Sequence, residues 1–280
     1  MNEHSLSRRG LIKTSLLGLG AASVSAPTFA KATNDAQGKA TYDAIVLGAG
    51  PAGLVTAITA HDAGAKVVVC EKRDRPDGNA IFAIGSVCGW GSRHQKEQGI
   101  SDTAEAFYKM MMDISQQMGD PILNRVYTDN IPSAIDWLES EIGVKFKKIR
   151  MMPYPRLGRT CRVDGEGITG GSQLVQKLLA ACQKRGIEIL WEHKGVELLH
   201  NDKFEVIGVK VLTPVGTKTL FSKSGVAIAT GGFSANPGMV DQYIGGGDAH
   251  GHSRLSLHDR GKHFVNPALV REVRQYGPIP

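Results

Sequence analysis

A glycine-rich turn between a short apolar run and a helix-like segment restricts the fold more than any other feature of this chain. The run Ala44–Leu47 is typical of a buried parallel strand, and Gly53–Ala63 has the small and apolar residues of a helix packed on a sheet. Between them, Gly48, Gly50 and Gly53 form the pattern G-x-G-x-x-G. These glycines allow a tight turn, close approach of a pyrophosphate, and close packing of helix on strand. We therefore predict a strand–turn–helix unit whose free N–H groups meet phosphate charge.

A second apolar run, Lys66–Cys70, follows the helix-like segment and ends at Glu71. Together the segments make a βαβ unit, the context in which G-x-G-x-x-G indicates dinucleotide binding. An acid at the end of the second strand is placed to accept hydrogen bonds from ribose hydroxyls, and it repels a 2′-phosphate, which argues against NADP. FAD and NAD both satisfy this pattern. The candidate cofactor contacts of the unit are Gly48, Ala49, Gly50, Pro51, Ala52, Gly53 and Glu71.

The first thirty residues have the three zones of a twin-arginine export signal. A polar start carries Arg8 and Arg9, an apolar run follows, and small residues ending at Ala30 offer a cleavage site. The apolar run is too short and too Gly-rich to span a bilayer. We predict a signal peptide over 1–30, a linker over 31–40, a periplasmic location, and no stable membrane span after cleavage. An uncleaved amphipathic tail or a chance arginine pair is the alternative. Because this route carries folded proteins, a cofactor taken up before export is expected.

Charge and cysteine spacing argue against several other chemistries. The formal net charge is +6, and removal of residues 1–30 takes away three basic side chains and one acidic one, leaving +4 without a long basic run. This balance gives little reason to expect nucleic-acid binding. The cysteines form no C-x-x-C pair, so zinc, iron–sulfur and covalent haem ligation are unsupported, and a disulfide stays open. We expect Cys70 and Cys182 to pack in the core.

Four further segments combine strand ends with Gly-rich loops in a fixed order along the chain. They are Glu71–Ala80, Arg162–Gly171, Gly186–Leu199 and Gly225–Asn236. On these segments the chain resembles the flavoprotein subunit of the fumarate reductase and succinate dehydrogenase family, in particular its soluble periplasmic fumarate-reductase-like and tricarballylate-dehydrogenase-like branches. The resemblance runs from about Tyr42 to Tyr243.

The resemblance implies FAD as the cofactor, because a strand ending in Ala-Thr-Gly-Gly is a second FAD fingerprint in this family. It implies a loop over the pyrophosphate and flavin, and a valine whose backbone faces the adenine. The residues assigned to FAD in this way are Lys72, Gly78, Asn79, Ala80, Val196, Ala229, Thr230 and Gly231. Asp77 and Ala80 stand where the family has glycine and serine, which removes backbone freedom and a hydroxyl donor. Arg162 is either a partner for a substrate carboxylate or a solvated side chain.

We predict an α/β fold with a Rossmann-like parallel sheet, helices on both faces, and an inserted antiparallel β-meander. This is an incomplete form of the two-dinucleotide-binding type of FAD fold. The FAD-binding domain is predicted over 41–243, with a helical segment at 101–150 and the meander at 194–224. Residues 244–280 are predicted to begin a cap domain or to form an unstructured tail.

Capping and periodicity predict the helices. Asp102 and Glu105 resemble a capping box, and further helices are expected over Pro121–Tyr127 and Ser133–Ile142. An apolar stripe at helical spacing is expected to pack in the core rather than to serve a redox role. Its members are Phe107, Met110, Met111, Ile114 and Met118. Another helix should begin at Gly170-Gly171 and pack through one apolar face. That face consists of Leu174, Val175, Leu178, Leu179 and Cys182.

The resemblance is lost after Tyr243. Family members continue into a cap domain whose arginine donates a proton to substrate, and then return with a Gly-rich segment that completes the flavin site. Here Ser253–Asp259 is only faintly similar to the tricarballylate dehydrogenase branch. The histidines of 244–280 lack a carboxylate or cysteine at ligand spacing, so no metal site is predicted. No catalytic residue is assigned.

The resemblance implies a flavoprotein oxidoreductase of fumarate reductase type, with flavin hydride transfer to or from a small unsaturated or polycarboxylic acid. The absence of haem motifs then requires a separate electron partner, either a haem protein or a quinone-linked protein. A truncated or split, non-catalytic flavin-binding module that needs a partner chain is the alternative. NAD-dependent catalysis is a third and weaker hypothesis.

Overall fold

The computed structural model describes residues 41–76, 78–149, 158–165 and 168–233, together with 236, 238, 239 and 242. The predicted signal peptide, the linker and the segment 244–280 lie outside the described residues, as does Asp77. Within the described part of the chain, no helix combines the length and the apolar character that a membrane crossing needs.

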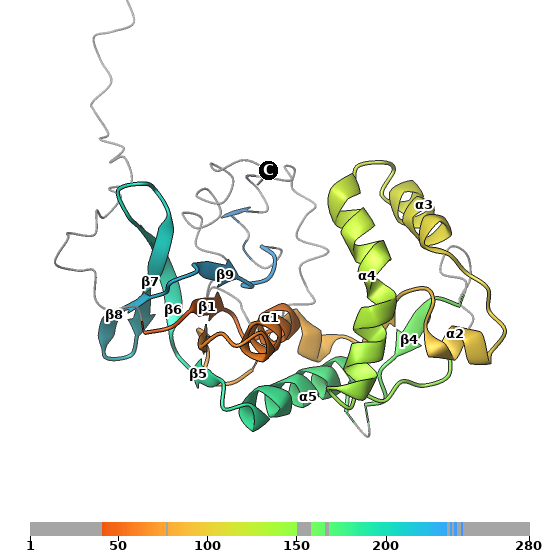
Figure 1. Cartoon of the computed structure of the whole chain (residues 1–280), viewed down its shortest axis with the longest axis horizontal. Helices are drawn as coiled ribbons and strands as arrows, with labels where there is room; N and C mark the ends of the chain where they lie inside the picture. The colour runs from red at the N-terminus through yellow and green to blue at the C-terminus, as the bar shows by residue number, and fades with distance from the viewer. Residues whose placement is uncertain are drawn as a thin grey trace, which may run out of the picture. The chain divides into compact units, whose positions relative to one another are not determined.

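A parallel sheet of four short strands forms the centre of the fold (Figure 1). Its strands are β1 (Ala44–Leu47), β2 (Val67–Cys70), β5 (Glu188–Leu190) and β9 (Val226–Ile228). The order across the sheet is β5-β2-β1-β9, so the last strand of the sheet pairs with the first. The helix α1 (Pro51–Asp62) connects β1 to β2, as the sequence predicts.

Both faces of the parallel sheet are covered, because successive side chains of a strand point to opposite sides. Val46 and Val69 face the helices α1 and α5 (Gly170–Lys184), whereas Ile45 and Val68 face an antiparallel meander. The meander consists of β6 (Lys194–His200), β7 (Val206–Thr213) and β8 (Gly216–Phe221). These elements confirm the predicted α/β class with its inserted meander. In the described residues the meander, rather than helices, covers the second face.

A helical segment with its own apolar cluster lies between β2 and α5 in the sequence. Its elements are η2 (Asn79–Phe82), β3 (Ser86–Cys88), α2 (Arg93–Glu97), α3 (Ala104–Ile114), α4 (Pro121–Ser140) and β4 (Thr160–Arg162). The strands β3 and β4 pair antiparallel. The side chains of Phe107, Ile131, Ile135 and Cys161 are buried together between the helices and this small sheet.

The capping box predicted at Asp102 is wrong. The N-cap of α3 is Thr103, whose hydroxyl accepts a hydrogen bond from Ala106 N at 3.1 Å. Asp102 instead pairs with Arg159, far along the chain, and a buried arginine is a stronger partner for a carboxylate than a helix amide. Glu105 lies in the first helical turn and pairs with Arg125.

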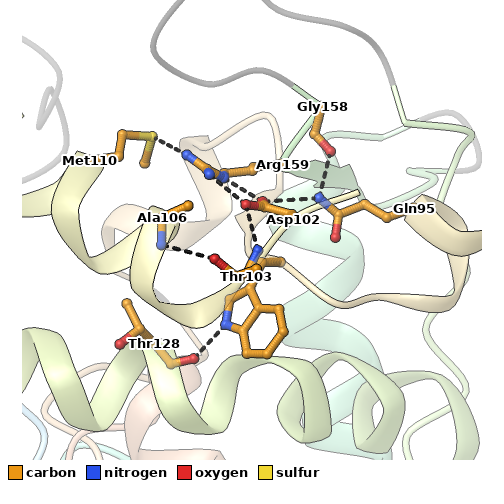
Figure 2. A network of polar contacts seen from close by, with 9 residues as sticks. Gln95, Asp102, Thr103, Ala106, Met110, Thr128, Gly158 and Arg159 are labelled. Carbon is orange, nitrogen blue, oxygen red and sulfur yellow. Dashed lines mark hydrogen bonds and ion pairs between the residues drawn. The ribbon is translucent and has the colours of Figure 1, made fainter. Parts of the chain in front are cut away.

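The two helices predicted after Pro121 are one continuous helix, α4, with Pro132 inside it. A proline has no N–H to bond the carbonyl four residues earlier, which here belongs to Thr128. That carbonyl accepts a hydrogen bond from the indole Nε1 of Trp90 at 2.7 Å (Figure 2). The substitute donor explains why the helix continues through the proline.

The apolar stripe of α3 is only partly in the core. Phe107 and Met110 are buried, as expected, but Ile114 is 55% exposed and Met118 is 85% exposed. Met118 lies beyond the end of α3, which stops at Ile114, so the helical spacing does not place it on the buried face. The expectation of core packing is therefore wrong for these two residues.

All four cysteines are free thiols, and Cys70 and Cys182 are buried as the sequence predicts. Burial, together with the nearby charge of Glu188, raises the pKa of Cys70 to about 12. Burial likewise raises the pKa of Cys182 to about 11. Both thiols are therefore protonated at neutral pH and act as small apolar side chains.

Candidate cofactor site

The first glycine-rich turn is held by contacts within the chain. Gly48 has φ +106°, and its N–H donates to Cys70 O at 2.8 Å. A Cβ on Gly48 would lie 2.5 Å from Ala229 O, and a Cβ on Gly53 would lie 1.9 Å from Gly48 O. The first and third glycines of the pattern are therefore required by backbone conformation and by packing of the turn itself.

Gly50 is different, because nothing in the described chain requires it to be glycine. Its backbone is extended, with φ −77° and ψ 175°, and a Cβ there would meet no atom within 4 Å. Gly50 is also the N-cap of α1, where no side chain caps the helix and Pro51 occupies the first turn. The first N–H groups of a helix have no partner within the helix and favour an anion. The open space beside Gly50 and this helix end therefore fit a phosphate group.

Glu71 is buried, and its carboxylate is built into the turn. One oxygen accepts a hydrogen bond from Ala49 N at 2.8 Å, and the other accepts one from Arg73 N at 3.0 Å. Its backbone is fixed as well, because Glu71 O accepts from His193 N at 2.8 Å. Glu71 follows β2 directly, which is the position from which an acid accepts hydrogen bonds from ribose hydroxyls in this motif. The sequence predicts the ribose role but not the bond that shapes the turn.

Val196 lies in a β-bulge. The pairing of β6 with β7 shifts register between Gly195 and Glu197, so Val196 is the extra residue. A Cβ on Gly195 would lie 2.9 Å from Leu47 Cδ1, so the glycine brings this part of β6 close to the end of β1. The bulge thus lies near the end of β1, where the glycine turn begins.

The second glycine-rich segment meets the first one directly. Ala229 N donates to Leu47 O at 2.9 Å, and Thr230 Cα lies 3.4 Å from the position of a Cβ on Gly48. Gly231 follows with φ +81°, a conformation that favours glycine. Although widely separated in sequence, the two segments form one surface at the carboxyl ends of β1 and β9. Open α/β sheets bind ligands at this edge.

The predicted flavin loop is placed against α5. Gly78 has φ +107°, and Asn79 and Ala80 begin the short helix η2. Gly78 and Asn79 are exposed, and Ala80 is half-buried. Lys72 is half-buried beside Glu71, and Arg162 is exposed on β4. An exposed Arg162 fits either of the roles that the sequence leaves open.

A buried polar network between α2, α3 and the start of β4 was missed by the sequence reasoning (Figure 2). Arg159 donates two hydrogen bonds of 2.5 Å to Asp102 and one of 2.9 Å to Met110 Sδ. Gln95 joins it by donating to Asp102 and to Gly158 O. The network joins α2, α3 and the start of β4. A lone arginine in an irregular segment gives no sequence signal for such a pair.

A cavity of about 530 Å³ lies at the opposite edge of the sheet. Tyr42, Lys66 and Glu188 are among the residues that line it, and the Tyr42 hydroxyl donates to Glu188 at 2.7 Å. These residues lie at the amino ends of the strands, away from the glycine turns. We therefore do not assign the cavity to the cofactor. Among the residues that the structure describes, no cluster of metal-ligating side chains occurs.

A parallel sheet with paired glycine turns at its carboxyl edge and an acid after the second strand defines a dinucleotide-binding α/β protein. The particular family follows from comparison with known proteins. Residues 43–258 match the family described as FAD binding domain. The chain belongs to this family, and FAD is its cofactor.

The chain is similar to larger flavoproteins. It is 36% identical to NADH:fumarate oxidoreductase of Klebsiella pneumoniae, over 75% of this chain and 22% of that protein. It is 33% identical to fumarate reductase (cytochrome) of Shewanella frigidimarina, over 70% of this chain and 34% of the relative. An open flavocytochrome c3 fumarate reductase superposes with a TM-score of 0.70 at 28% identity, covering 75% of this chain and 37% of that structure. The chain spans about a third or less of these relatives.

Proposed function

We propose that this chain is the FAD-binding part of an exported oxidoreductase of fumarate reductase type. The substrate would be a small unsaturated or polycarboxylic acid. Electrons would come from a separate haem protein or quinone-linked protein. The names of the relatives support this proposal, because they include fumarate reductases that use NADH or a cytochrome. The predicted signal over 1–30 supports a periplasmic location for the mature chain, with residues 41–243 as its FAD-binding domain.

The proposed cofactor contacts fall into three groups. The N–H groups of Gly50 and of the first turn of α1 would bind the pyrophosphate, because those of Gly48 and Ala49 already donate to Cys70 O and to Glu71. Glu71 would accept from the ribose. Val196 and the second glycine segment would line the adenosine side. Bound FAD supplies hydride transfer. The residues that would complete the site are Ala49, Pro51, Ala52, Lys72, Gly78, Asn79, Ala80, Ala229, Thr230 and Gly231.

The open position beside Gly50 is the observation that carries this assignment. Gly48 and Gly53 are explained by contacts inside the chain, but Gly50 has a conformation that any residue adopts and an empty space where its Cβ would lie. Besides the preference for glycine over alanine at an N-cap, a reason for glycine here is a bound group that approaches this backbone. A pyrophosphate fits, because the uncapped start of α1 lies at the same place.

A visible spectrum tests the proposal. The full chain, purified after overexpression with added riboflavin and then desalted, should retain FAD close to one per chain. Dithionite should bleach the flavin absorbance, and fumarate should restore it if the chain is active alone. A colourless protein that binds no added FAD would contradict the proposed cofactor site. Replacing Arg8 and Arg9 with lysine should keep the protein in the cytoplasm if the export signal is correct.

A flavin-binding module that needs a partner polypeptide is the second candidate. One observation favours it: the end of α3 and the first turns of α4 expose a row of large apolar side chains. They are Ile114, Met118, Ile122, Leu123 and Val126, each 55% exposed or more. Apolar surface of this kind is commonly covered by further polypeptide. Bound, reducible flavin without turnover on fumarate or related acids would support this candidate over an autonomous enzyme.

A further inference from the structure

The loop that carries Gly78, Asn79 and Ala80 has little packing of its own. No residue of η2 is buried, and the hydrogen bond from Ile81 N to Gly78 O is long, at 3.4 Å. Ala80 and Ile81 are only partly buried against the core, so the segment depends on hydrogen bonds to neighbouring elements for a fixed position. The position of this loop must therefore come from what it contacts.

The start of α5 supplies those contacts through hydroxyl groups. Thr169 Oγ1 lies 2.7 Å from Ile81 O, and Ser172 Oγ lies 2.8 Å from the same carbonyl. The two hydroxyl oxygens are 2.8 Å apart. Each hydroxyl has one proton, so Ser172 donates to the carbonyl while Thr169 donates either to the carbonyl or to Ser172. Thr169 also caps α5, by accepting from Ser172 N at 3.0 Å.

Glycines at the start of α5 allow this close contact. A Cβ on Gly171 would lie 1.8 Å from Ala80 O, and a Cβ on Gly170 would lie 2.4 Å from Ile84 O. Gly171 N donates to Ala83 O at 3.1 Å. The backbone of the loop thus rests directly on the backbone of the helix start. This contact gives Gly170-Gly171 a role inside the chain.

We propose that Thr169 and Ser172 are positioning residues for the cofactor, which hold the loop of Gly78, Asn79 and Ala80 in place through the carbonyl of Ile81. The inference rests on the proposed function, in which these three residues contact FAD. In this proposal the hydroxyls act on the cofactor through the loop. They set the loop before FAD arrives, and loss of the hydrogen bonds adds an ordering cost to binding.

Two substitutions separate the loop contact from the helix cap. Ser172→Ala removes one donor to Ile81 O and leaves the Thr169 cap, because the cap uses the backbone N–H of residue 172. Thr169→Val removes both the cap and a donor, and Thr169→Ser keeps both. The matched control is Thr103→Val, which removes the N-cap of α3 without touching the loop.

FAD binding and loop exchange in the full chain provide the readouts. FAD dissociation, followed by the recovery of flavin fluorescence, should be about three- to tenfold faster in Ser172→Ala. FAD dissociation should be at least as fast in the double variant Thr169→Val/Ser172→Ala as in Ser172→Ala alone. Thr169→Ser and Thr103→Val should match the parent chain. In the apoprotein, hydrogen exchange at residues 79–83 should rise in Ser172→Ala and stay unchanged in Thr103→Val.

Failure of this inference can be told apart from failure of the proposed function. Tight FAD binding by the parent chain with unchanged FAD dissociation in the double variant would overturn the positioning role and leave the cofactor site intact. Unchanged loop exchange would also overturn it, even if FAD binding weakened. If Thr103→Val accelerated FAD release as much as Thr169→Val, a general loss of helix stability would explain the faster release, and the positioning role would be overturned. If the parent chain bound no FAD, the proposed function and the positioning role would both fail.

Discussion

Gly50→Ala should separate cofactor binding from folding more cleanly than any other change in the first turn. The new methyl group points into open space, so the folded apoprotein accepts it without a clash. Two small contributions to the free energy of unfolding then oppose each other. Loss of backbone freedom in the unfolded chain stabilises by about 0.4–1 kcal/mol, whereas alanine is a poorer N-cap than glycine by a similar amount. The melting temperature of the apoprotein should therefore change by only about 1–2 °C.

FAD binding should respond much more strongly to the same methyl group. The methyl occupies the space through which a pyrophosphate would approach the N–H groups of α1. Pushing the phosphate away should lose one charge-assisted hydrogen bond, about 1.5–3 kcal/mol, which corresponds to about ten- to hundredfold weaker binding. Titration of the apoprotein with FAD, followed by quenching of flavin fluorescence, measures the dissociation constant directly.

Gly53→Ala is the matched control, because its methyl group would lie 1.9 Å from Gly48 O and must displace backbone. It should destabilise the apoprotein by about 1–3 kcal/mol or more. FAD binding of Gly50→Ala equal to that of the parent chain would refute the reasoning. So would a drop in its melting temperature as large as that of Gly53→Ala.

Three further predictions concern buried polar groups. Glu71→Ala leaves two backbone N–H groups without their acceptor and should lower the free energy of unfolding by about 2 kcal/mol in urea titrations, with weaker FAD binding. Burial raises the pKa of Asp102, but hydrogen bonds from Arg159 outweigh burial and hold the pKa below 3.8. The ion pair therefore stabilises the folded chain fully above pH 3.8, and this stabilisation is lost as the pH falls through the lower pKa that Asp102 has in the folded state. Asp102→Asn should cost about 3 kcal/mol at pH 7, and its stability should depend less on pH below 4 than that of the parent chain. Cys70 should resist Ellman's reagent at pH 8 until the chain is unfolded. Rapid labelling of Cys70 itself in the native protein, located by peptide mapping, would contradict its burial.

Local pattern predicted much of this fold. The strands at Ala44–Leu47 and Lys66–Cys70, the helix that begins at Gly170, and the meander over 194–224 all follow from apolar periodicity and turn residues. These elements can be recognised because the pattern of apolar residues within each segment determines which side chains are buried. The family resemblance implied only that Ala229 contacts FAD, and no sequence feature predicted its contact with Gly48.

Long-range polar partners account for two of the errors. Asp102 looks like a helix cap until Arg159 is placed beside it, and Pro132 looks like a helix end until Trp90 supplies the missing donor. In both cases the deciding group lies well away in the sequence. The hydrogen bond between Thr169 and the carbonyl of Ile81 was not predicted for the same reason, because neither local sequence indicates the other. The role of each glycine in the first turn likewise depends on which backbone atoms lie next to it in the folded chain.

The pairing of β1 with β9 has a consequence for the order in which the protein is made. Until β9 leaves the ribosome, one edge of β1 has no neighbour in the sheet, and the backbone of Ala229 does not yet pack on the Gly48 turn. An exposed apolar strand edge invites pairing with other chains. The nucleotide cleft is therefore incomplete until residues 226–229 have been made, long after Arg8 and Arg9. In the proposed export of a protein that already holds FAD, recognition of the predicted signal would have to wait for β9. The timing of folding would then matter as much as the signal itself.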